Sequence, residues 1–170
     1  MHALAALIAA LSSYVGLTSR VDALTPREKA ALLVVSSPPA PAGVAGVLLH
    51  SWEVDEPVPR RALVMVDQEG GAVRAYPGLP PAAAAASYRS VRAARSAGRA
   101  AGQGLDGVGV DVDLAPVLDS PDGPLGSRHF RRASYAVAFA RGLADAGVAA
   151  CAKHFPGLGS SDAGRGPKRR

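Results

Sequence analysis

The chain has 170 residues, enough for one ordinary domain but fewer than the roughly 250 typical of a closed eight-stranded (β/α) barrel. Its composition, 48% hydrophobic and 19% charged, excludes wholesale disorder. Most of the net charge of +5 comes from residues 164–170, which hold four cationic side chains and no acid. A short basic end without interleaved aromatic residues is typical of a solvated tail, so no nucleic-acid partner is expected.

The two ends of the chain are predicted to lie outside the main domain, which we place at residues 24–159. Residues 1–23 are expected to form an apolar helix or a degenerate signal, since no Lys or Arg precedes the apolar stretch Met1–Leu11. That stretch is too short to span a bilayer, so no membrane span is expected. The expected location is the cytoplasm, or an extracytoplasmic one if the segment acts as a signal. Residues 160–170 are predicted to be a disordered basic tail.

Within the domain, helices and strands are predicted to alternate. Thr25 as N-cap and Pro26 at the first helical position start a helix that is expected to run to about Val35. An Ala-dense stretch predicts a longer helix at Ala82–Gln103. Ser134 as N-cap predicts another, which is expected to run to about Ala146. Short apolar runs predict four buried strands: Gly46–His50, Ala62–Val66, Val108–Leu118 and Val148–Ala152. Strands that are apolar on both faces and alternate with helices indicate an α/β fold with a parallel sheet.

Several features predict no metal, cofactor or disulfide. Cys151 is the only cysteine, and its apolar surroundings predict a buried structural thiol. Asp111 and Asp113 alternate on one strand face, but no His or Glu stands at ligand spacing, so we interpret them as near-surface acids. Gly102–Gly107 has the G-x-G-x-x-G spacing of a dinucleotide-binding motif. That motif must follow a strand and begin a helix, whereas this segment is predicted to end a helix, so no dinucleotide site is expected.

Polar residues follow three of the four predicted strands at their carboxyl ends. They are Asp67, then Asp119 with Arg128 beyond it, then Lys153 and His154. In open α/β sheets and in closed barrels alike, ligands bind beyond the carboxyl ends of parallel strands. Charged groups in this position after three strands therefore predict a site for a polar ligand.

Four segments resemble glycoside hydrolase family 3, especially its β-N-acetylhexosaminidase branch, and they occur in the family's order. Val66–Gly71 reads VDQEGG, Val110–Asp119 is similar to GVDxxxAPVLD, Gly126–Phe130 resembles G-x-R-S-F, and Ala152–Gly157 resembles A-K-H-F-P-G. The resemblance covers about residues 24–159. It implies an incomplete (β/α) TIM-type barrel, about the first four βα units of the eight.

The resemblance also implies a set of substrate-binding residues. In the family, the Asp of VDQEGG holds sugar hydroxyls, a role that falls here to Asp67. The Arg of the G-x-R loop and the Lys-His pair correspond to Arg128, Lys153 and His154, which are expected to contact the sugar. Where the family usually reads R-V-Q-R the second Arg is lost, and Arg74, one position earlier, is the candidate to replace it.

The residues that perform the family's chemistry are not assignable in this sequence. No His follows His154, Leu158 stands where the family often has a His, and Asp162 near the expected acid/base loop has no His partner. Retaining glycoside hydrolysis needs a nucleophile and a proton donor for the leaving oxygen. No catalytic residue is therefore predicted, and the chain is expected to be a truncated, inactive portion of a glycosidase.

Three hypotheses follow. In the first, the parent protein hydrolyses terminal β-N-acetylhexosamine residues of N-acetylglucosamine-containing glycans, such as cell-wall fragments, without metal or cofactor. In the second, the chain is a non-catalytic sugar-binding or half-barrel subunit that another chain completes, because four βα units leave an open sheet edge. In the third, the Gly/Arg-rich ending reflects a frame-shifted or mis-called gene product with no stable fold.

Overall fold

The structure is a computed structural model that describes residues 20–155 and 157–158. The predictions for most of residues 1–23, for the tail at 160–170 and for Asp162 lie outside the described residues. Five strands form one parallel sheet in the order β1-β2-β3-β6-β7. They are β1 (Val34–Ser36), β2 (Gly46–Leu49), β3 (Leu63–Val66), β6 (Val112–Asp113) and β7 (Ala149–Ala150).

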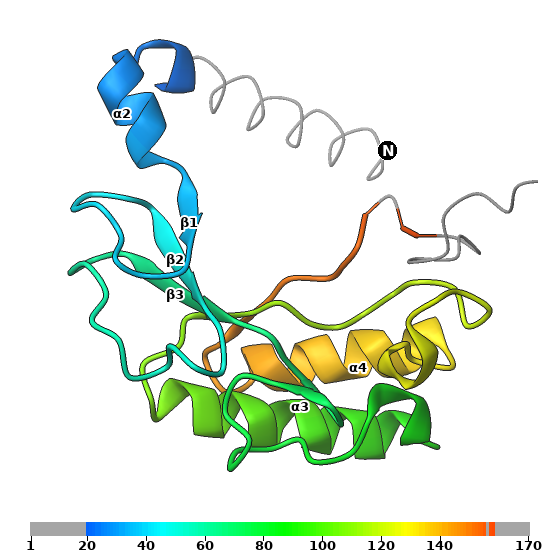
Figure 1. Ribbon diagram of the computed structural model, residues 1–170. Helices are drawn as coiled ribbons and strands as arrows, with labels where there is room; N and C mark the ends of the chain where they lie inside the picture. Colours follow the sequence, from blue (N-terminus) through cyan, green and yellow to red (C-terminus); the bar gives the residue numbers. More distant parts are fainter. Residues whose placement is uncertain (1–19, 156, 159–170) are drawn as a thin grey trace, which may run out of the picture.

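In the part of the chain that the structure describes, the sheet is accompanied by the helices α2 (Pro26–Ala31), α3 (Val91–Asp106) and α4 (Ala133–Ala144). Helices α3 and α4 lie side by side beneath the sheet (Figure 1). Short 3₁₀ turns occur at Ala85–Ser87 and Gly126–Arg128, and a small antiparallel hairpin joins β4 (Gln68–Gly70) to β5 (Val73–Arg74). None of the helices in the described part of the chain is long and apolar enough to cross a membrane.

The register of the sheet brings the carboxyl ends of its strands to one edge. Val66, the last residue of β3, pairs with Leu49 on one side and with Asp113 on the other. Asp113 in turn pairs with Ala150 of β7. Because the strands are parallel and end level with one another, the residues that follow β2, β3, β6 and β7 meet above the same edge.

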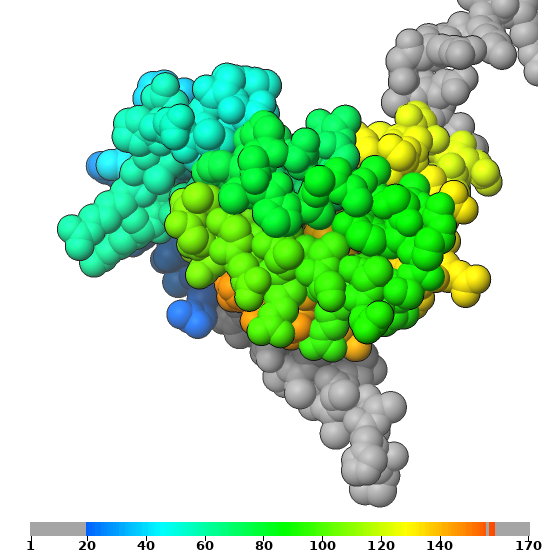
Figure 2. Space-filling view, turned by 90° about the horizontal axis from the view of Figure 1, so that it is seen from below, coloured from blue at the N-terminus to red at the C-terminus, as the bar shows by residue number. Residues whose placement is uncertain are grey.

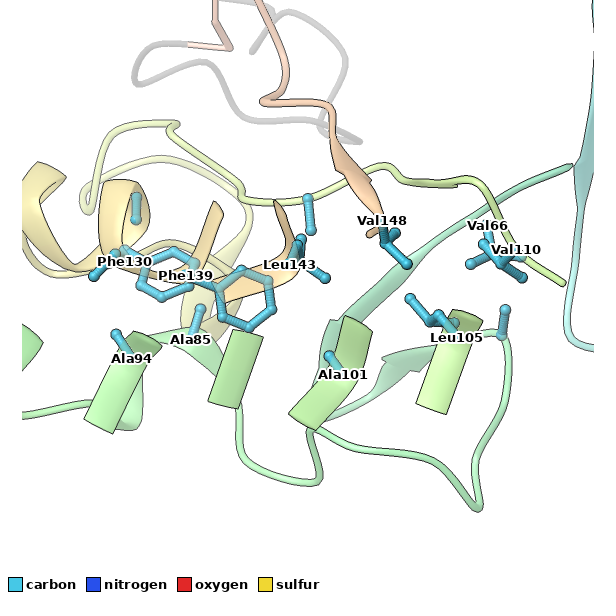
Figure 3. Close-up of a cluster of buried hydrophobic side chains, with 14 of the residues drawn as sticks. Val66, Ala85, Ala94, Ala101, Leu105, Val110, Phe130, Phe139, Leu143 and Val148 are labelled. Carbon is cyan, nitrogen blue, oxygen red and sulfur yellow. The ribbon is translucent and has the colours of Figure 1, made fainter. Parts of the chain in front are cut away.

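The hydrophobic core lies between the two long helices and the sheet. Ala94, Gly98, Ala101 and Leu105 recur at helical spacing and form the buried face of α3. Phe139 and Leu143 of α4, together with Val66, Val110 and Val148 of the sheet region, complete the cluster (Figure 3). In a view from below, the green segment that contains α3 forms much of this face of the molecule (Figure 2).

The predicted α/β class with a parallel sheet is confirmed, but several element boundaries were wrong. The first helix begins at Pro26 with a complete Thr25–Glu28 capping box, as expected, yet it ends at Ala31. The β-branched residues Val34 and Val35 instead pair with β2 and form an unpredicted strand. Residues 72–81, which lie between the second predicted strand and the helix predicted from Ala82, contain the β5 strand of the hairpin.

The later helices and strands are shorter than predicted, and the predicted burial of Cys151 was wrong. Helix α3 begins after Ser90, whose hydroxyl accepts from the Ala93 N–H, and not at Ala82. Ser134 lies inside α4 and does not cap it. Cys151 is exposed, not buried. It follows β7, the last strand in the sheet order, and β7 itself is exposed in the part of the chain that the structure describes.

The close approach of α3 and α4 yields a stability prediction. A methyl group at Gly98 would overlap the backbone carbonyl of Phe139, which cannot move aside like a flexible side chain. Gly98→Ala is expected to lower the free energy of unfolding by about 1–3 kcal/mol despite its better helix propensity. Gly104→Ala, in the same helix, meets only the Leu79 side chain at 3.3 Å and serves as the control. Urea unfolding checks both, and equal stability of the two variants would contradict the prediction.

Candidate functional site

A cluster of charged side chains lies at the carboxyl edge of the sheet. Asp67 follows β3, Glu69 lies in β4, Arg128 ends the second 3₁₀ turn, and Lys153 follows β7. Arg128 forms a two-pronged ion pair with Glu69, with Nε–Oε2 at 2.8 Å and Nη2–Oε1 at 2.7 Å. Lys153 Nζ lies 2.6 Å from Glu69 Oε1 and also contacts Asp67 Oδ1. These four residues are called the charge cluster below.

Glu69 is the centre of the charge cluster. Its side chain is only 2% exposed, so its ionised form carries a desolvation penalty that by itself would raise the pKa. Hydrogen bonds from Arg128 and Lys153 and the charges of both cations outweigh that penalty, and the pKa of Glu69 is lowered from its ordinary value. The carboxylate is therefore ionised at neutral pH and fixes both cations in place.

Within the charge cluster, Asp67 is open to a ligand while Lys153 is mostly covered. The side chains are 36% and 13% exposed, respectively. Lys153 is held from its backbone as well, because its N–H donates to Pro116 and its carbonyl accepts from the Leu118 N–H. The exposed oxygen of Asp67 is thus presented on a rigid, charge-balanced base.

His154 belongs to a second pair beside the cluster. Its Nδ1 lies 2.7 Å from Asp119 Oδ2, and its backbone N–H donates to the same oxygen at 3.1 Å. The other Asp119 oxygen accepts from the Leu158 N–H at 2.7 Å. Burial would raise the pKa of Asp119, but the hydrogen bonds from His154 and Leu158 reverse that effect and lower it. Asp119 therefore orients the His154 ring as a carboxylate.

Asp113 lies behind the charge cluster and differs from its prediction. Asp111 is exposed, as expected, and accepts from the Val64 N–H, but Asp113 is completely buried. Its Oδ1 accepts from the Gln68 N–H at 2.9 Å, while Oδ2 has no hydrogen-bond partner among the described residues. Burial raises the pKa of Asp113 from 3.8 to about 7. The prediction of a near-surface acid was wrong because β6 is an interior strand, paired with β3 on one side and with β7 on the other.

Arg74 lies near Asp67 but is engaged elsewhere. Its Nε donates to the Gly71 carbonyl at 3.0 Å and its Nη1 to the Pro77 carbonyl at 2.5 Å. These bonds hold the loop after the hairpin, which the Gln68 side chain also fixes through the Tyr76 backbone. Arg74 nevertheless lines the same depression as Asp67, so its position is compatible with the predicted contact.

Two open depressions flank the Asp67–Lys153 pair. One, of about 190 Å³, has Asp67 and Arg74 in its lining, and the other, of about 310 Å³, has Lys153 and His154. The structure thus brings Arg128 and Lys153 together on Glu69, with Asp67 in contact with Lys153 and with His154 next to Lys153 in the chain. Among the described residues, no group of three His, Cys, Asp or Glu side chains could hold a metal ion.

Two residues at this site were not among the predicted ligand contacts. Glu69 lies within the VDQEGG segment, but the sequence gives no sign that it, and not Asp67, is the buried counter-ion of both cations. Asp119 was noted only as a polar strand end. The sequence does carry a signal for this pairing, because Asp119 follows one apolar strand and His154 follows the next.

Fold and site together resemble proteins of the (β/α) barrel type, in which ligands bind at the carboxyl ends of the strands. A site that offers carboxylate acceptors and cationic donors side by side suits a ligand with hydroxyl groups. Comparison with known proteins identifies the class more closely. The family model "Glycosyl hydrolase family 3 N terminal domain" matches residues 49–169, and the chain belongs to this family.

The chain is similar to several curated beta-hexosaminidases. Beta-hexosaminidase LpqI of Mycobacterium tuberculosis is 39% identical over 110 residues, which cover 56% of this chain and 28% of that protein. A beta-hexosaminidase of Methylococcus capsulatus is 42% identical over 112 residues, covering 57% and 34%. The solved structure of a family 3 beta-N-acetylglucosaminidase from Paenibacillus sp. strain FPU-7 superposes with a TM-score of 0.68 at 25% identity, covering 82% and 35%.

These matches confirm the predicted family and the predicted fold, an incomplete barrel of the family's type. The chain spans about a third of the length of the curated relatives it matches.

The buried position of Glu69 predicts a large effect of its removal. Glu69→Gln leaves Arg128 and Lys153 without their shared counter-charge and is expected to lower the free energy of unfolding by about 3–5 kcal/mol. Asp145→Asn is the matched control, because it breaks the exposed Arg95–Asp145 pair and should leave the free energy of unfolding almost unchanged. Urea unfolding at neutral pH measures both. A Glu69→Gln loss as small as that of the control would contradict the assignment.

The raised pKa of Asp113 predicts a pH-dependent contribution to stability. Between about pH 4 and pH 7 the folded chain binds a proton at Asp113 that the unfolded chain has lost, so this group makes stability fall as pH rises through that window. Asp113→Asn removes the effect. Relative to the wild type, the variant should gain on the order of a few kcal/mol between pH 4 and pH 8. Parallel pH–stability curves from urea unfolding would show the prediction to be wrong.

Proposed function

We propose that this chain provides the sugar-binding part of a retaining β-N-acetylhexosaminidase site, which acts on terminal β-linked N-acetylhexosamine residues of glycans such as cell-wall fragments. The observation that carries the proposal is the charge cluster. In it an accessible Asp67 carboxylate lies beside the buried Glu69 and its two cations, Arg128 and Lys153, at the carboxyl ends of the strands of a barrel-type sheet.

The chemistry of the charge cluster supports a sugar as its ligand. A sugar hydroxyl donates one hydrogen bond and accepts others, so it needs acceptors and donors within a few ångströms of each other. Asp67 supplies the acceptor, and the partly exposed Arg128 and His154 supply donors. Bonds to charged groups are roughly twice as strong as neutral ones, and the preformed ion pairs remove most of the cost of ordering them. The hexosaminidase relatives support an N-acetylhexosamine as that sugar.

The described residues do not supply the bond-breaking step. Glu69 and Asp119 have lowered pKa values and are saturated with hydrogen bonds, so neither suits a proton donor at neutral pH. Asp113 has a suitable pKa of about 7, but it is fully buried behind the charge cluster and cannot reach a leaving oxygen. A nucleophile on the opposite face of the sugar ring is likewise unassigned. Hydrolysis then requires groups outside the described part of the chain.

Among the described residues, the exposed strand β7 at the side of the sheet favours a second candidate, a non-catalytic half-site that another chain completes. Beside β7, an apolar depression is lined by residues that include Leu118, Val137 and Ala150. Leu118 and Val137 are about half exposed, and β7 is exposed too. An open strand edge with apolar neighbours is a site for further pairing. This candidate shares the sugar contacts of the first and differs in the source of the catalytic groups.

Calorimetric titration with N-acetylglucosamine tests the proposal. The purified chain should bind the sugar saturably, and Asp67→Asn should weaken binding about tenfold or more, because it removes a charged acceptor at the accessible oxygen. Asp106→Asn, at the far end of α3, is the matched control and should bind like the wild type. No turnover of a chromogenic N-acetylglucosaminide is expected from the chain alone. Absence of binding by a folded sample would overturn the proposal.

A further inference from the structure

Trp52, in the turn after β2, is the one tryptophan of the chain and lies open to solvent. Its exposed fraction is 76%, the largest among the big apolar side chains described except that of Phe155. The indole stacks on the imidazole of His50, with ring centroids 4.9 Å apart and the two planes at 8°. One face of the indole is thereby occupied, and the high exposure leaves the rest of the ring accessible.

The support beneath Trp52 is itself fixed. Nδ1 of His50 lies 2.8 Å from Glu53 Oε2, and the His50 N–H donates to the same oxygen at 3.1 Å. The Glu53 N–H donates back to the His50 carbonyl at 2.8 Å and closes the turn. Because the turn holds the imidazole and the imidazole holds the indole, the aromatic surface is ordered before any ligand arrives.

This aromatic surface shares a depression with the charge cluster. Trp52 and His50 line the cavity of about 190 Å³ whose other walls include Asp67 and Arg74. Asp67 also contacts Lys153, which lines the neighbouring depression. A disaccharide bound over Asp67 would therefore have one ring at the charge cluster and the other ring beside the indole.

The chemistry of a pyranose ring fits the Trp52 wall. A pyranose in its chair form has an apolar face of C–H groups and a rim of hydroxyls. An exposed aromatic face is complementary to the first, and a nearby carboxylate to the second. We propose that Trp52, stacked on His50, is the binding platform for the second sugar of the glycan, the one joined to the N-acetylhexosamine at the charge cluster. This inference rests on the proposed function and extends it to the substrate's length.

The uniqueness of Trp52 makes the platform directly observable. Indole fluorescence of the wild-type chain reports on this residue alone. Titration with a β-1,4-linked disaccharide of N-acetylglucosamine should shift the emission to shorter wavelength as a sugar ring displaces water from the indole. N-acetylglucosamine alone, bound at the charge cluster, should leave the emission nearly unchanged.

Calorimetry on variants provides the second measurement. Trp52→Ala should weaken binding of the disaccharide about tenfold and leave binding of the monosaccharide within about twofold. Trp52→Phe should recover part of the loss, because it keeps an aromatic face. Val108→Ala is the control, since it removes an exposed apolar side chain that lies before β6, at the opposite end of the sheet.

The possible outcomes separate this inference from the proposed function. Monosaccharide binding that depends on Asp67, with disaccharide binding unaffected by Trp52→Ala, overturns the platform and leaves the proposed function standing. Equal weakening of both sugars by Trp52→Ala also overturns it, because Trp52 would then belong to the first sugar's site. Failure of a folded wild-type chain to bind either sugar overturns both proposals together.

Discussion

The site depends on one buried carboxylate. Glu69 is almost completely withdrawn from water, and it remains ionised because Arg128 and Lys153 approach it from two different parts of the chain. Of the two cations, Lys153 also contacts the half-exposed Asp67, and it lines one of the two depressions beside the charge cluster. A charge that is costly to bury thus ties β4, the second 3₁₀ turn and the segment after β7 into one rigid polar surface.

The parallel sheet makes this convergence possible. Its strands end level with one another, so residues distant in sequence meet at one edge without long connecting loops. The close contact of α3 and α4, which Gly98 and Gly142 permit, forms the layer beneath the sheet, and α4 also packs against β7. The core therefore supports β7, the strand that leads to Lys153 and His154.

The sequence predicted the class of fold and the end of the sheet at which the charged residues gather, because both follow from local patterns. Apolar runs that end in charged residues are visible without knowledge of tertiary contacts, and four motif segments indicated the family. The strand at Val34–Ser36 and the burial of Asp113 could not be predicted in this way, since each depends on which neighbours a strand acquires in the sheet. The role of Glu69 was missed for a related reason. Whether Asp67 or Glu69 is the buried acid depends on where Arg128 and Lys153 lie in the folded chain, which the sequence alone does not specify.

The central claim is that the charge cluster at the strand ends is a sugar site. The most direct test is a crystal structure of the chain with N-acetylglucosamine. The account predicts one sugar above Lys153, with its hydroxyls within hydrogen-bond distance of Asp67 and of Arg128 or His154, and with the Glu69 ion pairs intact. A sugar bound elsewhere on the surface, with the charge cluster in contact only with water, would contradict it.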